Sequence, residues 1–316
     1  MGFAARRSSL VWKNCRGVRG DKHVAWRISR CFYVNCVGIG GAVCGRRAAA
    51  KKSPAGIAGA FLVRQPWDLE FGGSATSDFN YRGFSISNRR PSGTVYVRPV
   101  YDGLYAGLQA STLDIPFDTP GVLDFHAGYR RLIGPVLFEV RANYYHFPNS
   151  VIPTTSIATG IDYWEIQTRP VWAVNDHLVL IGHAAYAPDF INSGASETWI
   201  SGAVVVKDTI KPMPGWLAYA SGELGHHRFG ISDRGVDLPD FSAWNIGAGL
   251  VYKHVTFDLR YYDSNLSKEE CAVLTGDLGA TPGGAPSAVN PLGLRSNWCS
   301  ASIVGKISFA ASLAKL

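Results

Sequence analysis

From residue 67 onward the chain alternates between apolar and polar residues, and the pattern is clearest in the segment from Thr94 to Thr112. In its second half, two series of residues alternate. One series is small or aliphatic, namely Leu104, Ala106, Leu108 and Ala110, and the other is mainly polar, namely Tyr105, Gly107, Gln109 and Ser111. A period of two predicts a β-strand with one apolar and one polar face. Before it, Asp102-Gly103 fits a two-residue type I′ turn, because both turn residues must adopt positive φ. The segment is therefore predicted to be a tight β-hairpin.

Similar alternating segments, bounded by turn residues, predict twelve strands. They lie at about 68–81, 93–101, 104–112, 122–131, 135–146, 161–174, 177–187, 198–207, 216–227, 243–252, 255–262 and 297–309. The last strand either ends on the aromatic residue Phe309 or extends further. An even number of antiparallel strands can close into a barrel that pairs every strand edge. The pattern predicts an all-β fold, a closed antiparallel transmembrane β-barrel of about twelve strands.

The connections between these segments alternate in length. The short ones are 102–103, 132–134, 175–176, 208–215 and 253–254. The longer ones are 82–92, 113–121, 147–160, 188–197, 228–242 and 263–296. Short turns at one end and long loops at the other are typical of barrels in the bacterial outer membrane, whose short turns face the periplasm. A soluble β-sandwich has no reason to separate its loops in this way, so we expect the cell outer membrane as the location.

Seven tryptophans follow residue 65, and all fall near a predicted strand end. Those near the short connections are Trp67, Trp172 and Trp216, and those near the long ones are Trp164, Trp199, Trp244 and Trp298. Indole rings favour the lipid headgroup layer because they combine an apolar body with a hydrogen-bonding tip. We expect two aromatic girdles. The alternative is that aromatic residues favour strands in general, so that some of them fall near strand ends.

Composition and charge set the N-terminal part apart. The chain of 316 residues has 35 glycines and only 17% charged residues, and it lacks an apolar run long enough for a membrane-spanning helix. Residues 1–65 hold 13 of the 31 basic residues and a single acid, Asp21, whereas the remainder has 18 basic and 23 acidic residues. Basic charge confined to an extension does not predict a body that binds nucleic acid.

Residues 1–65 are expected to be a disordered or wrongly started leader, and 66–316 the barrel. Segment 25–50 loosely follows the order of a secretory signal peptide, with basic, apolar and then small residues. The fit is poor, because a long stretch precedes the segment and Asn35 interrupts its apolar part. The spacing of Cys31, Cys36 and Cys44 does not match a zinc site. We expect no metal and no cofactor.

One motif carries a resemblance to a known family. Segment 77–87, SDFNYRGFSIS, resembles the first-strand motif of the TorF-family porins, outer-membrane β-barrels of Gram-negative bacteria. The resemblance extends over about residues 67–309 in hairpin spacing and includes the stretch from Tyr105 to Leu108. It implies a porin-like barrel and supplies no catalytic residues.

If the apolar faces meet lipid, the opposite faces carry charges of both signs. The expected pore-lining residues are Glu70, Asp78, Arg98, Asp124, Arg130, Glu139, Arg141, Glu165 and Arg169. Barrels of about eight strands are filled by side chains and those of about sixteen hold an aqueous channel, so twelve strands leave a narrow passage or none. Opposed charges there either select small polar solutes or neutralise each other and plug the barrel.

Two pairs of side chains need separate interpretation. Cys271 and Cys299 are the cysteines of the barrel region, and an oxidising compartment favours a disulfide between them. The disulfide would close a loop, restrict its entropy in the unfolded chain and so stabilise the folded protein by roughly 3.5 kcal/mol.

His226 and His227 are adjacent on one strand, so they point to opposite faces and do not predict a shared metal ion. Motifs of hydrolases, phosphate-binding loops and zinc enzymes are absent from the sequence.

We therefore expect a passive porin for small hydrophilic solutes, surrounded by outer-membrane lipid and lipopolysaccharide and without enzymatic activity. Two alternatives stay open. An outer-membrane enzyme acting on lipid or lipopolysaccharide would need a serine and a histidine together on the lipid-facing surface near the long loops, and the histidine-bearing strands do not obviously offer that pair. A plugged barrel would have a structural or adhesive role.

Overall fold

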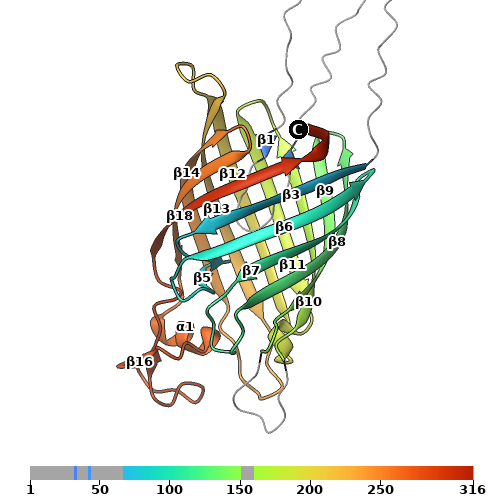
Figure 1. The fold of residues 1–316 in the computed structure, drawn as a ribbon. Helices are drawn as coiled ribbons and strands as arrows, with labels where there is room; N and C mark the ends of the chain where they lie inside the picture. Colours follow the sequence, from blue (N-terminus) through green and yellow to red (C-terminus); the bar gives the residue numbers. More distant parts are fainter. Residues whose placement is uncertain (1–31, 34–41, 44–66, 151–159, 316) are drawn as a thin grey trace, which may run out of the picture.

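The computed structural model describes residues 32–33, 42–43, 67–150 and 160–315. Within this part of the chain, twelve long antiparallel strands form one closed barrel (Figure 1). The strands are β3 (Trp67–Thr76), β6 (Ser92–Tyr101), β7 (Leu104–Thr112), β8 (Gly121–Ile133), β9 (Val136–His146), β10 (Tyr163–Ala173), β11 (Leu178–Ala187), β12 (Glu197–Thr209), β13 (Trp216–Phe229), β14 (Phe241–Tyr252), β15 (Val255–Ser264) and β18 (Ser302–Ser312). Neighbours in the barrel follow chain order, and it closes where β18 pairs with β3, with Phe309 opposite Gly73.

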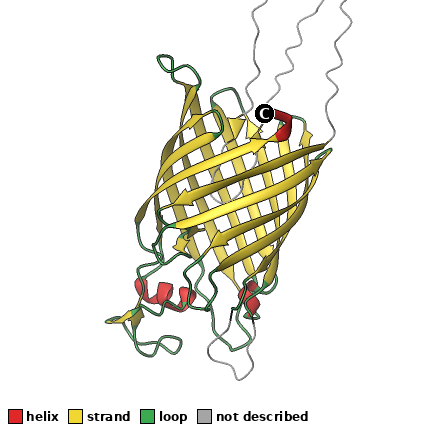
Figure 2. Ribbon diagram, viewed as in Figure 1, coloured by secondary structure: helices red, strands yellow, loops and turns green. Residues whose placement is uncertain are grey.

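The remaining elements are short (Figure 2). Three two-stranded pairs stand outside the barrel sheet: β1 (Phe32–Tyr33) with β2 (Ala42–Val43), β4 (Asn80–Tyr81) with β5 (Phe84–Ser85), and β16 (Thr281–Pro282) with β17 (Leu294–Arg295). The helices are η1 (Phe190–Asn192), α1 (Lys268–Thr275) and η2 (Leu313–Lys315), and no helix of the described residues is both long and apolar enough to cross a membrane. Apart from β1 and β2, the predictions for residues 1–65 lie outside the described residues.

The two ends of the barrel differ as the connection lengths predict. At the end that carries the C-terminus, called the turn end here, tight turns join the strands. Asp102 and Gly103 have φ of 46° and 90°, which confirms the predicted pair of positive φ angles in the first of these turns. At the opposite end, called the loop end here, lie the long connections with α1 and η1 (Figure 1).

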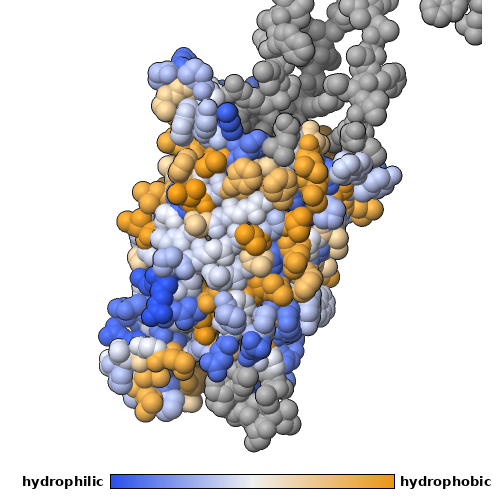
Figure 3. Space-filling model, in the orientation of Figure 1, coloured by the Kyte–Doolittle hydropathy of each residue, from blue (hydrophilic) through white to orange (hydrophobic). Residues whose placement is uncertain are grey.

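The outward strand faces are apolar around the barrel. Their exposed aliphatic and phenylalanine side chains include Val95, Leu108, Phe125, Val140, Ile166, Ile200, Val204, Leu224, Ile246, Leu259 and Ile307. Figure 3 shows apolar residues spread over the strands and hydrophilic residues gathered at the loop end. A soluble protein rarely exposes so extensive an apolar surface, whereas lipid requires one, and a closed barrel leaves no unpaired edge in the bilayer. The chain is therefore an outer-membrane β-barrel, which confirms the predicted fold class and location.

Two predicted strand boundaries are wrong. The first barrel strand ends at Thr76 instead of residue 81, because residues 80–81 pair with 84–85 in a separate hairpin. The last strand begins at Ser302 instead of residue 297. It extends beyond Phe309 to Ser312, which is the second of the two alternatives for its end. Each discrepancy lies at the loop end or at the chain end, where packing against loops replaces the regular alternation.

The tryptophans divide into two groups. Trp67, Trp164, Trp172 and Trp244 are exposed near strand ends, and the partly buried Trp216 stacks on Tyr252 with 4.9 Å between ring centroids. Trp199 and Trp298 are only 3% and 7% exposed, so their assignment to a lipid-facing girdle is wrong. Trp199 faces into the barrel, and the Trp298 indole N–H donates to Asn88 Oδ1 at 3.1 Å in the loops. The membrane girdles themselves stay a prediction.

The predicted disulfide between Cys271 and Cys299 is confirmed. It ties α1 to the segment before β18, and both cysteines are buried at the loop end. The Ser267 hydroxyl accepts from the Glu270 backbone N–H and the Glu270 carboxylate accepts from the Ser267 N–H, which caps the start of α1. Gly276 ends the helix at φ 62°. The longest loop is therefore fixed locally by its caps and covalently by the disulfide.

Candidate functional site

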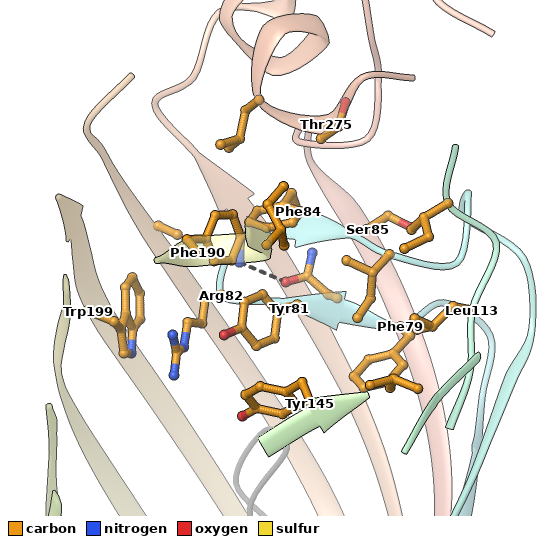
Figure 4. A pocket seen from close by; sticks show the side chains of 18 of the residues that line it. Phe79, Tyr81, Arg82, Phe84, Ser85, Leu113, Tyr145, Phe190, Trp199 and Thr275 are labelled. Atoms are coloured by element: carbon orange, nitrogen blue, oxygen red, sulfur yellow. Dashed lines mark hydrogen bonds between the residues drawn. The ribbon is translucent and has the colours of Figure 1, made fainter. Parts of the chain in front are cut away.

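The connection after β3 folds into the barrel at the loop end. Its hairpin, β4–β5, turns at Arg82 and Gly83, whose φ angles of 47° and 110° are both positive. The Asn80 side chain accepts from the Gly83 backbone N–H at 3.0 Å (Figure 4). Asp78 accepts from the Ser85 and Ser87 hydroxyls at 2.6 and 3.0 Å. Asp78 therefore stabilises this inward hairpin and does not lie on a barrel strand, so its assignment to the pore wall is wrong.

Arg82 at the hairpin tip joins the hairpin to two barrel strands. Its Nη1 atom lies 2.7 Å from Glu165 Oε2 on β10 and 3.0 Å from Glu197 Oε1 on β12. The two glutamate side chains are at most 1% exposed. Burial alone would lower the pKa of Arg82, but Glu165, Tyr81 and Glu197 outweigh burial and raise the pKa well above its ordinary value. The tip is thus held by a buried cation between two carboxylates, which we call the Arg82 latch.

Aromatic packing supports the latch. The Phe84 ring lies 6.3 Å from that of Phe241 and 6.4 Å from that of His227, centroid to centroid. His227 stacks on Phe241 at 4.6 Å and lies 4.5 Å from Trp199. The same buried cluster includes Leu274 of α1, Trp298 and both cysteines of the disulfide. In Figure 4 the hairpin lies between Thr275 of α1 and Tyr145 of β9, so it forms a roof across the loop end.

The wall below this roof carries charged ladders. Eight of the nine predicted pore-lining residues, all except Asp78, lie on inward strand faces. Glu70 is bound by Arg98 and Arg130, with the Arg98 Nη2 atom 2.7 Å from Glu70 Oε2. The Tyr105 hydroxyl donates to the Glu139 carboxylate. These contacts bring together residues of β3 and β6 to β9 near the turn end, whereas Glu165 joins the Arg82 latch instead.

Two arginines of this wall lack a contacting carboxylate among the described residues. Arg141 donates to the amide oxygens of Asn143 at 2.9 Å and Gln167 at 3.0 Å. Among the described residues, no carboxylate oxygen lies within 4.0 Å of the guanidinium of Arg141 or Arg169, although both residues are at least 93% buried. Asp124 and Glu139 act on these guanidinium groups only from beyond that distance, and a buried guanidinium that no carboxylate contacts is costly unless water solvates it. This part of the lumen is therefore expected to be hydrated.

Sequence reasoning missed an apolar section of the interior. Toward the turn end, β10 to β14 turn a cluster of apolar side chains inward, Val171, Val179, Ile181, Val205, Leu217, Tyr219 and Val251. It makes one side of the lumen apolar and leaves the opposite side to the charged ladders. The sequence signal for this cluster is a run of apolar residues without alternation, which makes both faces of the strand end apolar. The run AVVV from Ala203 to Val206 of β12 is an example.

A cavity lies between the roof and the charged wall. Its volume is about 170 Å³, and it is bordered by the hairpin, by the loops around Leu113 and Phe190, and by Arg141 and Gln167 of the wall.

Sequence reasoning missed Arg82 as a site residue, because the strand prediction places it in an external loop. Its Arg-Gly turn, next to the aromatic Tyr81 and Phe84, is the local signal that marks a hairpin.

On the outer surface, the structure brings a histidine and a serine together. His226 of β13 and Ser242 of β14 lie at the loop end, with 3.0 Å between His226 Nδ1 and Ser242 Oγ. The interpretation that the histidine-bearing strands offer no such pair is therefore wrong. His227 points inward, so the two adjacent histidines face opposite sides as predicted. Within the described residues, no group of three His, Cys, Asp or Glu side chains could hold a metal ion.

Solved structures similar to this chain are outer-membrane proteins of low sequence identity. The NanC porin is 10% identical, with 76% of this chain and 98% of that one covered and a TM-score of 0.42. An outer-membrane channel from Pseudomonas putida F1 is 12% identical, with 78% and 94% covered and a TM-score of 0.39. LpxR from Salmonella typhimurium is 8% identical, with 76% and 99% covered and a TM-score of 0.40. At these values the comparisons carry no argument about function.

Comparison at the sequence level gives one family. No curated protein matches the chain. A family model matches residues 63–280, and it is described as Gcw_chp, a bacterial protein of unknown function. The match covers most of the barrel from before β3 to beyond α1. The resemblance to the TorF-family porins stays a prediction.

Proposed function

We propose that this chain, which belongs to the Gcw_chp family of bacterial proteins of unknown function, is a narrow outer-membrane channel for small polar solutes. The supporting observation is the pair of buried arginines, Arg141 and Arg169, that face the lumen with no carboxylate oxygen of the described residues within 4.0 Å. A barrel with only a structural role would gain little from buried cations that no carboxylate contacts, because apolar packing in their place would be more stable. A hydrated passage gives both guanidinium groups the solvent that they need.

The roof determines how this passage works. With the β4–β5 hairpin docked, the Arg82 latch and the aromatic cluster occupy the loop end, so conductance is expected to be small. Release of the hairpin would leave the lumen open between Glu165 and the opposite wall. The channel is therefore proposed to be gated by its own first loop, with the lumen charges acting on solutes that enter.

Conductance in planar lipid bilayers tests the proposal. Purified wild-type barrel is expected to give small, stepwise currents, and variants that release the hairpin are expected to give larger ones. Heat-modifiable mobility on gels confirms in each case that the barrel is folded. Folded protein without currents, in the wild type and in a variant lacking residues 79–86, would contradict the channel and favour the plugged barrel.

One contact favours a second candidate function, an outer-membrane hydrolase of lipid esters. His226 and Ser242 form a nucleophile–base pair at hydrogen-bond distance on the outer face of the loop end. The pair ranks behind the channel, because no carboxylate of the described residues lies within 4.0 Å of His226 to orient the ring. Release of fatty acid from mixed micelles, abolished by Ser242→Ala, would establish this activity. Equal rates with the variant and with empty micelles would exclude it.

A further inference from the structure

The cavity under the hairpin has two chemically different sides. Its upper side is formed by aromatic and aliphatic residues of the hairpin and the loops, among them Phe79, Leu113, Phe117, Phe147 and Phe190. Its lower side is formed by polar residues of β9 to β11, namely Arg141, Gln167 and His183. A cavity of about 170 Å³ is close to the size of cavities of about 150 Å³ that hold one benzene ring. The cavity therefore has room for a small molecule with one apolar and one polar end.

The lower side presents polar atoms that have no hydrogen-bond partner among the described residues. Arg141 engages its Nε and Nη2 atoms with Asn143 and Gln167, and no described residue accepts from its Nη1 atom. His183 Nε2 is buried and has no hydrogen-bond partner among the described residues. Buried polar atoms in folded proteins are nearly always paired, so unpaired ones that border a cavity point to a missing partner. Each group borders the cavity and can donate to a ligand there, His183 in the tautomer that carries its proton on Nε2.

The charges around this point favour an anion. Arg82, Arg141 and Arg169 all act electrostatically on His183, but Glu165 and Glu197 already neutralise Arg82, so Arg141 and Arg169 supply the positive charge here. Asp124 and Glu223 also border the cavity, but neutral donors already occupy them. Asn143 donates to Asp124 at 2.8 Å, and the Ser201 hydroxyl donates to Glu223 at 2.7 Å. These carboxylates disfavour a second negative charge on the ligand, so a single anionic group placed at Arg141 fits best.

We propose that this cavity binds small monocarboxylates with an apolar body. The carboxylate accepts from Arg141 and His183, and the body packs beneath Phe79 and Phe117. Arginine suits this role because its planar guanidinium can donate to both carboxylate oxygens. The proposal deepens the proposed function by naming a solute class, and it rests on that function only for the transport step, since binding itself needs no conductance.

Isothermal titration calorimetry on the full chain in detergent tests the proposal. The probes are 3-phenylpropionate, 3-phenylpropan-1-ol and 3-phenylpropylamine, which share one body and differ in the charge of the end group. We expect the acid to bind at least tenfold more tightly than the alcohol or the amine. Tighter binding of the amine, or equal binding of all three, would overturn the proposal.

Variants of matched chemistry identify the site. Arg141→Gln is expected to weaken binding of the acid at least tenfold, and Arg141→Lys to restore part of it. Arg90→Gln removes an arginine that pairs with Asp114 at the surface and is expected to change nothing. If Arg141→Gln does not fold, Phe117→Ala in the loop serves as the second variant. It is expected to weaken the binding of 3-phenylpropionate and of 3-phenylpropan-1-ol by similar factors. Unchanged binding in every variant would place the ligand elsewhere and overturn the assignment.

Bilayer currents recorded with the same probes separate the two proposals. Block of the current by 3-phenylpropionate, absent in Arg141→Gln, places the bound acid in the conducting path. Binding without any conductance would leave the site standing and contradict the channel. Conductance without binding would contradict the site alone.

Discussion

Replacing Arg82 by methionine removes the cation of the Arg82 latch and keeps a side chain of similar length. The change leaves Glu165 and Glu197 buried without their shared partner, each with a side chain no more than 1% exposed. Removing one partner of a buried ion pair costs about 3–5 kcal/mol. Both carboxylates keep other neighbours: His227 Nδ1 lies 3.2 Å from Glu197, and Glu165 accepts from the Tyr145 hydroxyl at 3.3 Å and from the Gln167 amide. We therefore expect the lower end of the range, about 3 kcal/mol.

That free energy acts on the docked hairpin, because the barrel strands keep their own hydrogen bonds. Since about 1.4 kcal/mol is a tenfold change in an equilibrium, the ratio of released to docked hairpin should rise by about a hundredfold. Single-channel recording in planar bilayers measures the result directly. Arg82→Met is expected to show larger conductance steps or longer openings than the wild type.

The triple variant Arg82→Met, Glu165→Gln and Glu197→Gln is the matched control. It removes the uncompensated charges and leaves the packing of Phe84 on Phe241 intact. Conductance should therefore return toward the wild-type value. If Arg82→Met conducts like the wild type while its barrel is folded, the latch does not control the passage and the reasoning is refuted.

Three further outcomes are expected. Gly83→Ala should raise conductance in the same direction as Arg82→Met, because φ is 110° there and an added Cβ would clash with the Ala243 Cβ; unchanged currents would contradict the hairpin geometry. Reducing the disulfide, or replacing Cys271 and Cys299 by alanine, should lower stability by roughly 3.5 kcal/mol on the chain-entropy model for a separation of 28 residues, measured by urea unfolding in detergent. Phe125→Arg on the lipid-facing side should destabilise the barrel by about 2–4 kcal/mol in bilayers, whereas Gln109→Arg on the inward face should cost less; equal effects would argue against the assigned faces.

The barrel itself could be predicted from the sequence because its two environments are opposite. Each strand has lipid on one side and a polar lumen on the other, so alternation is present in nearly every strand and fixes which face is which. Two-residue turns also determine how the flanking strands pair, as the turn at Asp102-Gly103 does for β6 and β7. The inward positions of Arg98, Glu139 and Arg169 follow from the same alternation.

The roof could not be predicted in the same way, because its alternation imitates a strand. Phe79 and Tyr81 continue the apolar series of β3, although the chain has already left the barrel at Thr76. Glu197 was assigned to a loop, so its role as a latch partner could not be recognised. Trp199 was assigned to a girdle from its position near a strand end. Its parity with Glu197 and Ser201, which both face inward, would have given the correct side.

For a roof that opens, as proposed here, a charged latch is better suited than an apolar one. An apolar hairpin buried in an apolar ring loses its full hydrophobic stabilisation when it leaves, and the ring is then exposed to water. When Arg82 leaves Glu165 and Glu197, water entering from the hydrated lumen solvates all three charges and offsets part of the lost attraction. The two walls below differ, since β10 to β14 contribute a packed apolar cluster whereas β9 and β10 contribute the buried arginines for which we propose hydration. If the lumen is hydrated as proposed, the guanidinium groups of Arg141 and Arg169 lower the free energy needed to release the hairpin. Replacing both arginines by glutamine should then make openings rarer in single-channel recordings even with Arg82 in place, and unchanged opening would contradict this role.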